Sequence, residues 1–454
     1  MEATSPLPRV GGGVAARARP DGSAAARLRT RSLLGTGALC GGVAASLALA
    51  AGAASHRSAL VPGPLRDFPG WVAGPLRGLG IGTGTAAWEI ELGVMFGCYL
   101  VTLASLAGLG PRRVWSAIVA AHLVFVLGPA LFSADVFGYL DFARLGAVHG
   151  LDPYTHTSLA APHDPVYPFV GWHRVHSPYG PLFTVLTYGV VPLGLAAGLW
   201  TLKALAGLLS LATVALVWRT APVSGARRLG AVALLGLNPV LLAFAVGGAH
   251  NDTLLILLSV AAVAAVLGGR EATGGMAAVA ALGIKASAGL LLAFLLVAGR
   301  RRGRMAVGAA LAGAALVALA ILAFGPHAAG FASALRGQQG LVAVHSIPAQ
   351  AGRLLGASRP DSGVRAAFLA GFGVILAWQL WRARRTREWL TAAGWSTLAL
   401  LASTAWLLPW YVVWLLPLAA LREDRRLRAA ALLFTAYAIL TRVPFAAPAL
   451  DAVT

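Results

Sequence analysis

Long apolar segments recur along the chain and constrain its fold more than any other feature. Between residues 32 and 440, stretches almost free of charge alternate with short arginine-rich segments. Only 11% of the 454 residues are charged, less than half of the roughly 25% found in an ordinary soluble domain. Inside a bilayer the backbone must satisfy its own hydrogen bonds, and a helix does so within one segment. We therefore expect an all-α polytopic membrane protein.

The hydropathy pattern predicts about 13 transmembrane helices in a membrane domain over residues 32–445. The first follows a disordered, basic tail (residues 1–31), and its apolar run, residues 32–55, exceeds the roughly 7 to 15 residues of a signal-peptide core. The others are expected at residues 88–109, 114–132, 197–218, 229–246, 253–267, 276–284, 286–298, 305–324, 366–381, 389–406, 410–421 and 429–440. Several are too short to cross alone without local thinning or partial insertion. Residues 446–454 would form a short outer tail.

The distribution of arginine predicts the orientation of these helices. If the apolar segment at residues 181–195 spanned the membrane, every later basic loop would face outward, so we place it as an interfacial or re-entrant outer helix. The N-terminus and the arginine-rich loops then lie in the cytoplasm. With 24 arginines and six acids inside, the formal net charge of +20 divides into about +18 inside and about +2 outside. This charge therefore reports topology and attraction to the lipid bilayer, and it argues against a nucleic-acid partner.

Cysteine and histidine do not form a recognisable metal signature. Cys40 and Cys98 both lie in apolar runs, which leaves neither a disulfide framework nor a cysteine metal site. The histidines of the first outer loop lack the spacing of zinc ligands, and we expect them to form a hydrogen-bonding surface: His149, His156, His163, His173 and His176. The expected site therefore contains no assigned metal ligand.

Two polar loops on the outer side, residues 133–196 and 325–365, hold much of the informative sequence. In the first, Asp135 and Tyr139 are four residues apart and share one helical face. A carboxylate at the mouth of a membrane cavity can accept the proton of a sugar hydroxyl as a general base. Alternatively, Asp135 simply caps the helix that follows Ser133.

A polar turn separates two of the predicted spans. His250, Asn251 and Asp252 are costly there unless they face water, protein or a ligand. Together they could hold sugar hydroxyls or orient a phosphate. Asn251 and Asp252 are also good helix N-cap residues, which explains one of them but not the trio.

Lys285 interrupts an apolar segment and is expected to split it into two short helices. A lone lysine at this depth needs an anionic partner. A lipid phosphate from the outer leaflet would serve, with Lys203 or Arg353 as helpers. The alternative is that Lys285 snorkels to the outer interface.

Four aromatic residues are expected near the outer interface: Trp406, Trp410, Tyr411 and Trp414. An aromatic belt is the ordinary explanation of such a cluster. Stacking against a sugar or a prenyl chain is the functional alternative.

Seven short motifs, colinear over about residues 88 to 442, resemble one enzyme family. They are Ser133-Ala-Asp135-Val, Gly150-Leu-Asp152-Pro-Tyr154, Ser177-Pro-Tyr179-Gly-Pro-Leu, Asn238-Pro239, Gly248-Ala-His250-Asn251-Asp252, Ile284-Lys285 and Leu408-Pro-Trp410-Tyr411. The series resembles the actinobacterial polyprenol-phosphomannose-dependent alpha-1,6-mannosyltransferases of the GT-C superfold, in particular their MptB-like branch.

The resemblance implies a GT-C-type helical bundle with an outer, periplasmic catalytic loop. It implies a multi-pass glycosyltransferase of the cytoplasmic membrane that takes mannose from polyprenyl-phosphate mannose on the outer face. The acceptor would be a mannosylated glycolipid of the lipomannan type, elongated during cell wall biogenesis. Asp135 would be the catalytic base, and the substrate-binding residues would be Tyr139, Asp152, Tyr154, Tyr179, His250, Asn251, Asp252, Lys285, Arg353, Trp410 and Tyr411.

The implied reaction inverts the sugar, so one base suffices where a retaining enzyme needs two carboxyl groups. A divalent cation could bridge Asp135 and the donor phosphate, but no second carboxylate stands at a sure spacing, and metal dependence stays open. A transporter or flippase of lipid-linked sugars is the alternative function. That class predicts inverted repeats and ionisable groups near the midplane, whereas nearly all acids here fall in loops or at interfaces.

Overall fold

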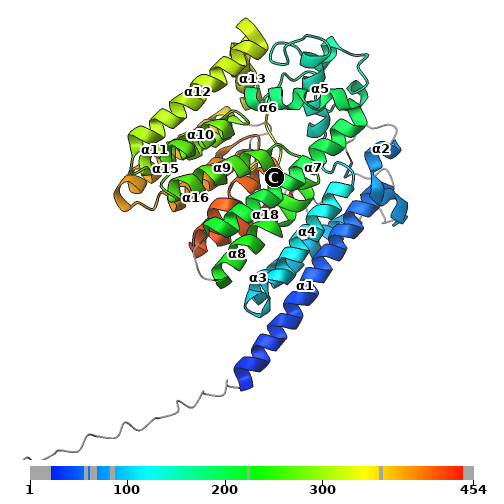
Figure 1. The fold of residues 1–454 in the computed structure, drawn as a ribbon, viewed down its shortest axis with the longest axis vertical. Coiled ribbons are helices and arrows are strands. Elements are labelled where there is room, and N and C mark those ends of the chain that lie inside the picture. The colour runs from blue at the N-terminus through cyan, green and yellow to red at the C-terminus, as the bar shows by residue number, and fades with distance from the viewer. Residues whose placement is uncertain are drawn as a thin grey trace, which may run out of the picture.

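The computed structural model describes residues 22–55, 60–61, 69–81, 87–221, 225–356 and 361–442, and within these ranges every regular element is helical (Figure 1). The expected N-terminal tail up to residue 21 and the C-terminal tail over residues 446–454 lie outside the described residues. The prediction of an all-α protein is confirmed for the part that the structure describes.

The N-terminal half forms one side of the bundle. The long helix α1 packs against α3 and α4, and α7 lies against α4 and α9 (Figure 1). The elements of this half are α1 (Gly22–Ser55), α2 (Gly70–Ala73), η1 (Pro75–Leu79), α3 (Ala87–Ser105), η2 (Leu106–Gly108), α4 (Pro111–Leu127), α5 (Asp135–Ala147), η3 (Ser158–Ala160), η4 (Tyr167–Phe169), α6 (Pro181–Tyr188), η5 (Val191–Leu193), α7 (Gly194–Thr220) and α8 (Gly225–Gly236).

The C-terminal half packs beside it, with α9 against α7 and α17 against α8, while α10 lies between α9 and α12. Its elements are the π-helix η6 (Val240–Val246), α9 (Asp252–Leu267), α10 (Glu271–Leu282), η7 (Ala286–Ala288), α11 (Gly289–Ala298), α12 (Arg302–Phe324), η8 (Gly325–Ala329), α13 (Gly330–Gln339), α14 (Ile347–Leu354), α15 (Ser362–Thr386), α16 (Trp389–Ser403), η9 (Pro409–Trp414), α17 (Leu416–Leu421) and α18 (Arg425–Leu440).

Five helices of the described chain are long and apolar enough to cross a membrane: Ser23–Ser55, Ala87–Gly108, Pro181–Thr220, Arg302–Gln338 and Ser362–Thr386. Counting the bent pair Arg227–Gly236 and Val240–Val246 as one span gives six. Others expected as spans, such as Asp252–Leu267, are apolar helices of 10–17 residues, shorter than the ~20 residues that reach across a hydrocarbon core. The chain is thus a polytopic membrane protein, and the full count of about 13 spans stays a prediction.

The predicted re-entrant segment at residues 181–195 contains α6, a helix of only eight residues, and η5. Pro181 stands at its first turn, where the missing backbone N–H costs nothing. α6 contacts α5 and α12 and so joins the start of the first outer loop to the helix that precedes the second. Its position relative to a bilayer stays a prediction.

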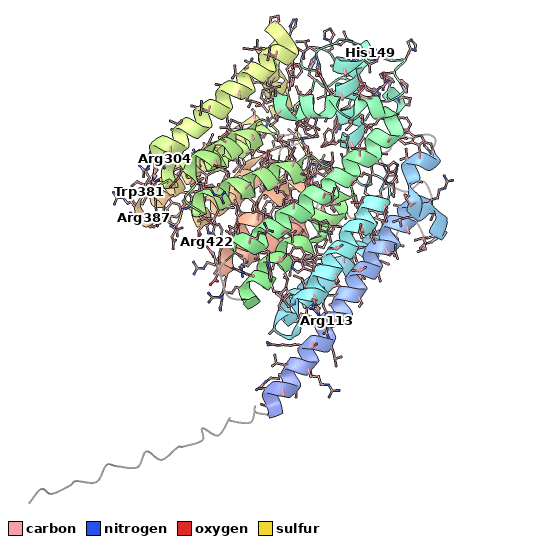
Figure 2. The ribbon with its side chains drawn as sticks, viewed as in Figure 1. Arg113, His149, Arg304, Trp381, Arg387 and Arg422 are labelled. Atoms are coloured by element: carbon pink, nitrogen blue, oxygen red, sulfur yellow. The ribbon has the colours of Figure 1, made fainter. Side chains whose placement is uncertain are left out.

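The arginines labelled in Figure 2 lie apart from the first outer loop. In Figure 2 the labelled Arg113, Arg304, Arg387 and Arg422 lie along its lower and left edges, and His149 of the first outer loop lies at the opposite edge. This separation is what the positive-inside pattern requires of loops on two sides of a membrane.

Candidate active site

A cavity of about 790 Å³ opens between the first outer loop, the break around Lys285 and the segment that contains η9. Of the residues predicted for the site, five line it: Asp135, Tyr179, Lys285, Trp410 and Tyr411. Among the described lining residues Asp135 is the only carboxylate. The other groups that face this space include the aromatic rings of Trp172, Trp406 and Trp414.

Asp135 is the first residue of α5, and its backbone N–H donates to Ser133 Oγ at 3.0 Å. Its side chain does not cap the helix, because the N-cap position belongs to Ala134 and has no side-chain cap. Asp135 Oδ2 instead lies 3.4 Å from Nδ1 of His250, longer than a good N–H···O hydrogen bond. Burial raises the pKa of Asp135, but contact with His250 and Ser133 and the charge of Lys285 outweigh it, and the pKa lies below its ordinary value.

His250 packs behind Asp135, on the side away from the cavity lining. Its ring is 1% exposed and stacks on Trp410, with centroids 3.9 Å apart and planes at 21°. Both ring nitrogens of His250, the Nδ2 of Asn251 and the indole N–H of Trp410 are buried without a hydrogen-bond partner among the described residues. Unpaired buried groups are costly, so these four atoms, of which the Trp410 N–H belongs to a residue that lines the cavity, mark a place where a polar ligand or water is expected.

Tyr139 and Asn251 join the outer loop to the polar turn. As predicted, Tyr139 lies on the same side of α5 as Asp135, and its hydroxyl lies 3.5 Å from Asn251 Oδ1 and accepts from the Asn251 backbone N–H at 3.3 Å. The Tyr139 ring packs edge-on against Tyr179 and Phe183, with centroids 4.9 Å away in each case. These contacts hold the first turns of α5 against the polar turn.

Lys285 is paired within the protein. The expected break occurs: α10 ends at Leu282, and Lys285 has an extended backbone before η7. Its Nζ donates to both carboxylate oxygens of Asp252, at 3.0 and 3.2 Å, and lies over the rings of Tyr411 and Trp414 at 4.4 and 5.2 Å. Trp414 Nε1 also donates to Asp252. Asp252 therefore fixes the ammonium group that the sequence suggested for a lipid phosphate.

A close backbone contact sets the position of this break. Gly180 N–H donates to the carbonyl of Ile284 at 2.9 Å, and Leu182 N–H donates to that of Gly283 at 3.1 Å. A Cβ atom at Gly180 would overlap the Gly283 carbonyl, so glycine permits this approach. The Ser177-Pro-Tyr-Gly-Pro motif thus holds the chain next to Lys285.

The other seven predicted site residues are not among the lining residues: Tyr139, His250, Asn251 and Asp252 pack behind the wall as described above, and Asp152, Tyr154 and Arg353 lie elsewhere. Asp152 accepts the backbone N–H of Tyr154 at 2.8 Å and so forms a turn, while Tyr154 OH donates to the Tyr179 carbonyl at 2.9 Å. Arg353 belongs to α14 and is not among the lining residues. Lys203, suggested as a helper of Lys285, is fully buried and donates to the carbonyls of Phe125, Pro129 and Gly247 at 2.9–3.0 Å.

The rest of the first outer loop is held by ion pairs and hydrogen bonds of its own. Asp164 accepts from Arg144 Nε at 2.8 Å and lies 2.7 Å from His149 Nε2. Asp141 accepts from Ser158 Oγ at 2.6 Å, and burial raises the pKa of Asp141 to about 6. The expected hydrogen-bonding role of the loop histidines therefore fits His149, which helps to shape the loop that carries Asp135.

Sequence reasoning missed Arg442, which lines the cavity just beyond the C-terminal end of α18. A signal for it existed. The orientation predicted from the distribution of arginine places the C-terminal end of the last span outside the membrane. An arginine there departs from the positive-inside pattern. His345, between α13 and α14, also lines the cavity and was not considered.

Two family models and a known protein match the chain. Residues 39–301 match the family model described as alpha-(1->6)-mannopyranosyltransferase, N-terminal domain, and residues 361–450 match the MptB C-terminal domain. The chain is 32% identical over 374 residues to alpha-(1->6)-mannopyranosyltransferase A of Mycobacterium tuberculosis, which covers 73% of this chain and 71% of that protein. No solved structure matches the chain. The two matched regions contain Asp135, His250, Lys285 and Arg442.

Proposed function

The chain belongs to the alpha-(1->6)-mannopyranosyltransferase family, and we propose that it transfers mannose from polyprenyl-phosphate mannose to a growing alpha-1,6-mannan glycolipid. It is a hexosyltransferase of the membrane. The donor, the lipomannan-type acceptor, the inverting course and the roles of single residues are our proposal. The cavity next to Asp135 is the observation that carries it, because it places one carboxylate beside a space large enough for sugar groups.

Asp135 is suited to act as the general base. Its lowered pKa keeps it ionised at neutral pH, and its Oδ1 and Oδ2 belong to the only carboxylate among the described lining residues. In the proposed step the acceptor hydroxyl oxygen bonds to C1 of mannose while the bond from C1 to the phosphate oxygen breaks. The hydroxyl proton moves to Asp135, and the electron pair of the broken bond leaves with the polyprenyl phosphate.

His250 would orient this carboxylate. Its ring is held flat against Trp410, so Nδ1 can approach Asp135 Oδ2 only from one direction. Asn251 Nδ2 and the Trp410 N–H would donate to hydroxyls of the bound sugars. Lys285, fixed by Asp252, has a third N–H that could donate to the mannosyl group.

The described residues contain no divalent-cation site built from protein ligands alone. No group of three or more His, Cys, Asp or Glu side chains among them is placed to hold a metal ion. The second carboxylate nearby, Asp252, already accepts from Lys285 and Trp414. A cation at this site would therefore be held by Asp135 and the donor phosphate.

We further propose that the N-terminus is cytoplasmic and that the cavity opens on the outer face of the cytoplasmic membrane. The separation of labelled arginines from His149 in Figure 2 supports this orientation. A lipid-linked donor and a glycolipid acceptor would then both reach the cavity from the outer leaflet. The family match does not favour the alternative, a transporter or flippase of lipid-linked sugars.

Transfer of radiolabelled mannose from polyprenyl-phosphate mannose, measured in membranes, tests the proposal. We expect Asp135→Asn to lower the rate by about 10²- to 10⁴-fold with unchanged protein abundance. Glu388→Gln is the matched control, since it removes an exposed carboxylate that pairs with Arg382 at 2.8 Å, and it should keep full activity. Undiminished transfer by Asp135→Asn would remove Asp135 from the mechanism. No transfer by the wild type would remove the proposed donor.

A further inference from the structure

The charges around the cavity leave one cation unaccounted for. Within the described wall the basic side chains are Lys285, His345 and Arg442, and the carboxylate is Asp135. Lys285 is neutralised by Asp252, whose side chain is fully buried. Of the two permanent cations in this wall, Arg442 is therefore the one whose charge is not offset by a directly bonded carboxylate.

The backbone around Arg442 is firmly placed. Its N–H donates to the Ile439 carbonyl at 2.9 Å, and the preceding Thr441 donates through Oγ1 to the Ala438 carbonyl at 2.8 Å. One turn earlier, Tyr437 OH donates to the His345 carbonyl at 2.6 Å. The end of α18 is thereby attached to the segment before α14, and this attachment turns Arg442 toward the cavity.

The guanidinium group itself is available. The side chain of Arg442 is exposed, and it makes no hydrogen bond or ion pair with another described residue. The negative charge of Asp135 acts on it electrostatically. A group with five N–H donors and no acceptor among the described residues is suited to bind an anion from outside.

Apolar side chains also line the cavity that contains Arg442. Leu341, Val342, Val344, Leu407 and Leu408 line it together with Arg442 and Asp135. Thr441, next to Arg442, shares a smaller neighbouring cavity with Leu407 and Leu408. A ligand at Arg442 thus shares one cavity with these apolar side chains and with the carboxylate Asp135.

We propose that Arg442, in place of Lys285, is the cation that binds the phosphate of the lipid-linked donor and stabilises it as it leaves. This inference rests on the proposed donor. As the bond between C1 and oxygen breaks, the phosphate gains a second negative charge, and the planar guanidinium can donate two parallel N–H bonds to its oxygens. The prenyl chain would then follow the apolar side chains of the cavity, and mannose would point toward Asp135.

Inhibition by the two short lipids farnesyl phosphate and farnesol tests Arg442 apart from the rest of the site. They share one chain, and only the first carries phosphate. In wild-type membranes farnesyl phosphate should inhibit mannose transfer more strongly than farnesol. In Arg442→Gln we expect inhibition by farnesyl phosphate to weaken by about 10- to 100-fold, while inhibition by farnesol stays the same.

The KM values separate binding of the phosphate from a general loss of structure. Arg442→Gln should raise the KM for polyprenyl-phosphate mannose and lower kcat, with the KM for the acceptor unchanged. Arg442→Lys keeps the charge but loses the planar guanidinium with its two parallel N–H donors. Inhibition of this variant by farnesyl phosphate should therefore fall between that of the wild type and that of Arg442→Gln. Arg336→Gln is the control, because Arg336 is exposed on α13 and bonds to Ala332 and Ser333.

Each outcome decides the inference. If Arg442→Gln transfers mannose and is inhibited by farnesyl phosphate as strongly as wild type, Arg442 does not bind the phosphate, although the proposed function stands. If Arg442→Gln does not accumulate, Arg442→Lys decides instead: inhibition equal to wild type would overturn the inference, and weaker inhibition with intact thermal stability would support it. If the wild type does not use the lipid donor, the proposed function itself fails.

Discussion

The ion pair between Asp252 and Lys285 allows a sharp test of how the polar centre is held together. Its members are 33 residues apart in sequence and come from the start of α9 and the break before η7. The Asp252 side chain is fully buried, and that of Lys285 is 16% exposed. We propose a double-mutant cycle with Asp252→Asn, Lys285→Met and the variant that carries both changes.

Either single change should destabilise the protein strongly. Asp252→Asn leaves an ammonium group among aromatic rings without its counter-charge, and Lys285→Met leaves a buried carboxylate with only the Trp414 N–H as a described side-chain donor. Removing one member of a buried pair typically costs about 3–5 kcal/mol. The double variant has no unpaired charge, so it should cost only about 1–2 kcal/mol, because packing and one hydrogen bond are still lost. The coupling free energy should therefore be about 4–9 kcal/mol in the ideal case, and at least about 2 kcal/mol if the protein relaxes around the single changes.

The free energy of unfolding, measured for all four proteins in the same detergent, gives this coupling directly. The exposed pair Arg382 and Glu388, with N and O 2.8 Å apart, is the matched control. Its cycle should give less than about 1 kcal/mol, since water screens an exposed pair. Additive costs at Asp252 and Lys285 would refute the reasoning, because they would mean that the two charges do not depend on each other in the fold.

Three further changes test the framework of the site. Gly180→Ala should reduce both mannose transfer and thermal stability, because its Cβ would push Gly283 away. Gly189→Ala is the control and should reduce neither, since its Cβ would meet the Leu186 carbonyl at an ordinary 3.4 Å. Equal behaviour of the two variants would contradict the role of the close contact. Lys203→Met removes the ammonium group from three buried carbonyls and should lower the free energy of unfolding by about 2–5 kcal/mol; a cost below about 1 kcal/mol would show that those carbonyls find other donors. Asp141 has a pKa of about 6, raised from 3.8, so its contribution to stability is fully present below the unfolded pKa and is lost as pH rises through about 6. Unfolding midpoints measured from pH 4 to 7 should therefore fall in the wild type relative to Asp141→Asn, and parallel curves would contradict the shift.

Local sequence patterns sufficed for the elements whose causes are local. The apolar run predicted at residues 88–109 appears as α3 and η2, and the break at Lys285 occurs where a charged residue and Gly283 interrupt the apolar pattern. The shared face of Asp135 and Tyr139 followed from helical periodicity. Each of these inferences needed only residues within a few positions of one another.

Contacts between distant segments could not be read in the same way. Nothing near Lys285 in sequence shows that Asp252 neutralises it, and nothing near Lys203 shows three carbonyls around its ammonium group. Both lysines looked free to bind phosphate because their partners come from other helices. Arg442 was overlooked for the converse reason: the fold brings the end of α18 to the cavity that Asp135 lines, although the two residues are about 300 positions apart in sequence.

Irregular backbone gathers where the polar groups are. Of the three described non-glycine residues with positive φ, Phe132 (63°) and Ala249 (55°) stand shortly before Asp135 and His250, and Arg387 (58°) ends α15 away from the site. Such conformations cost about 1–3 kcal/mol each and persist only where the surroundings enforce them. The enforcing contacts are visible: Phe132 N–H donates to the Leu60 carbonyl, and Lys203 binds the Gly247 carbonyl two residues before Ala249. A regular helix would turn successive side chains around its axis, whereas these interruptions direct Asp135 and His250 toward each other. The strained turns are therefore part of how the apolar bundle presents a carboxylate to its cavity.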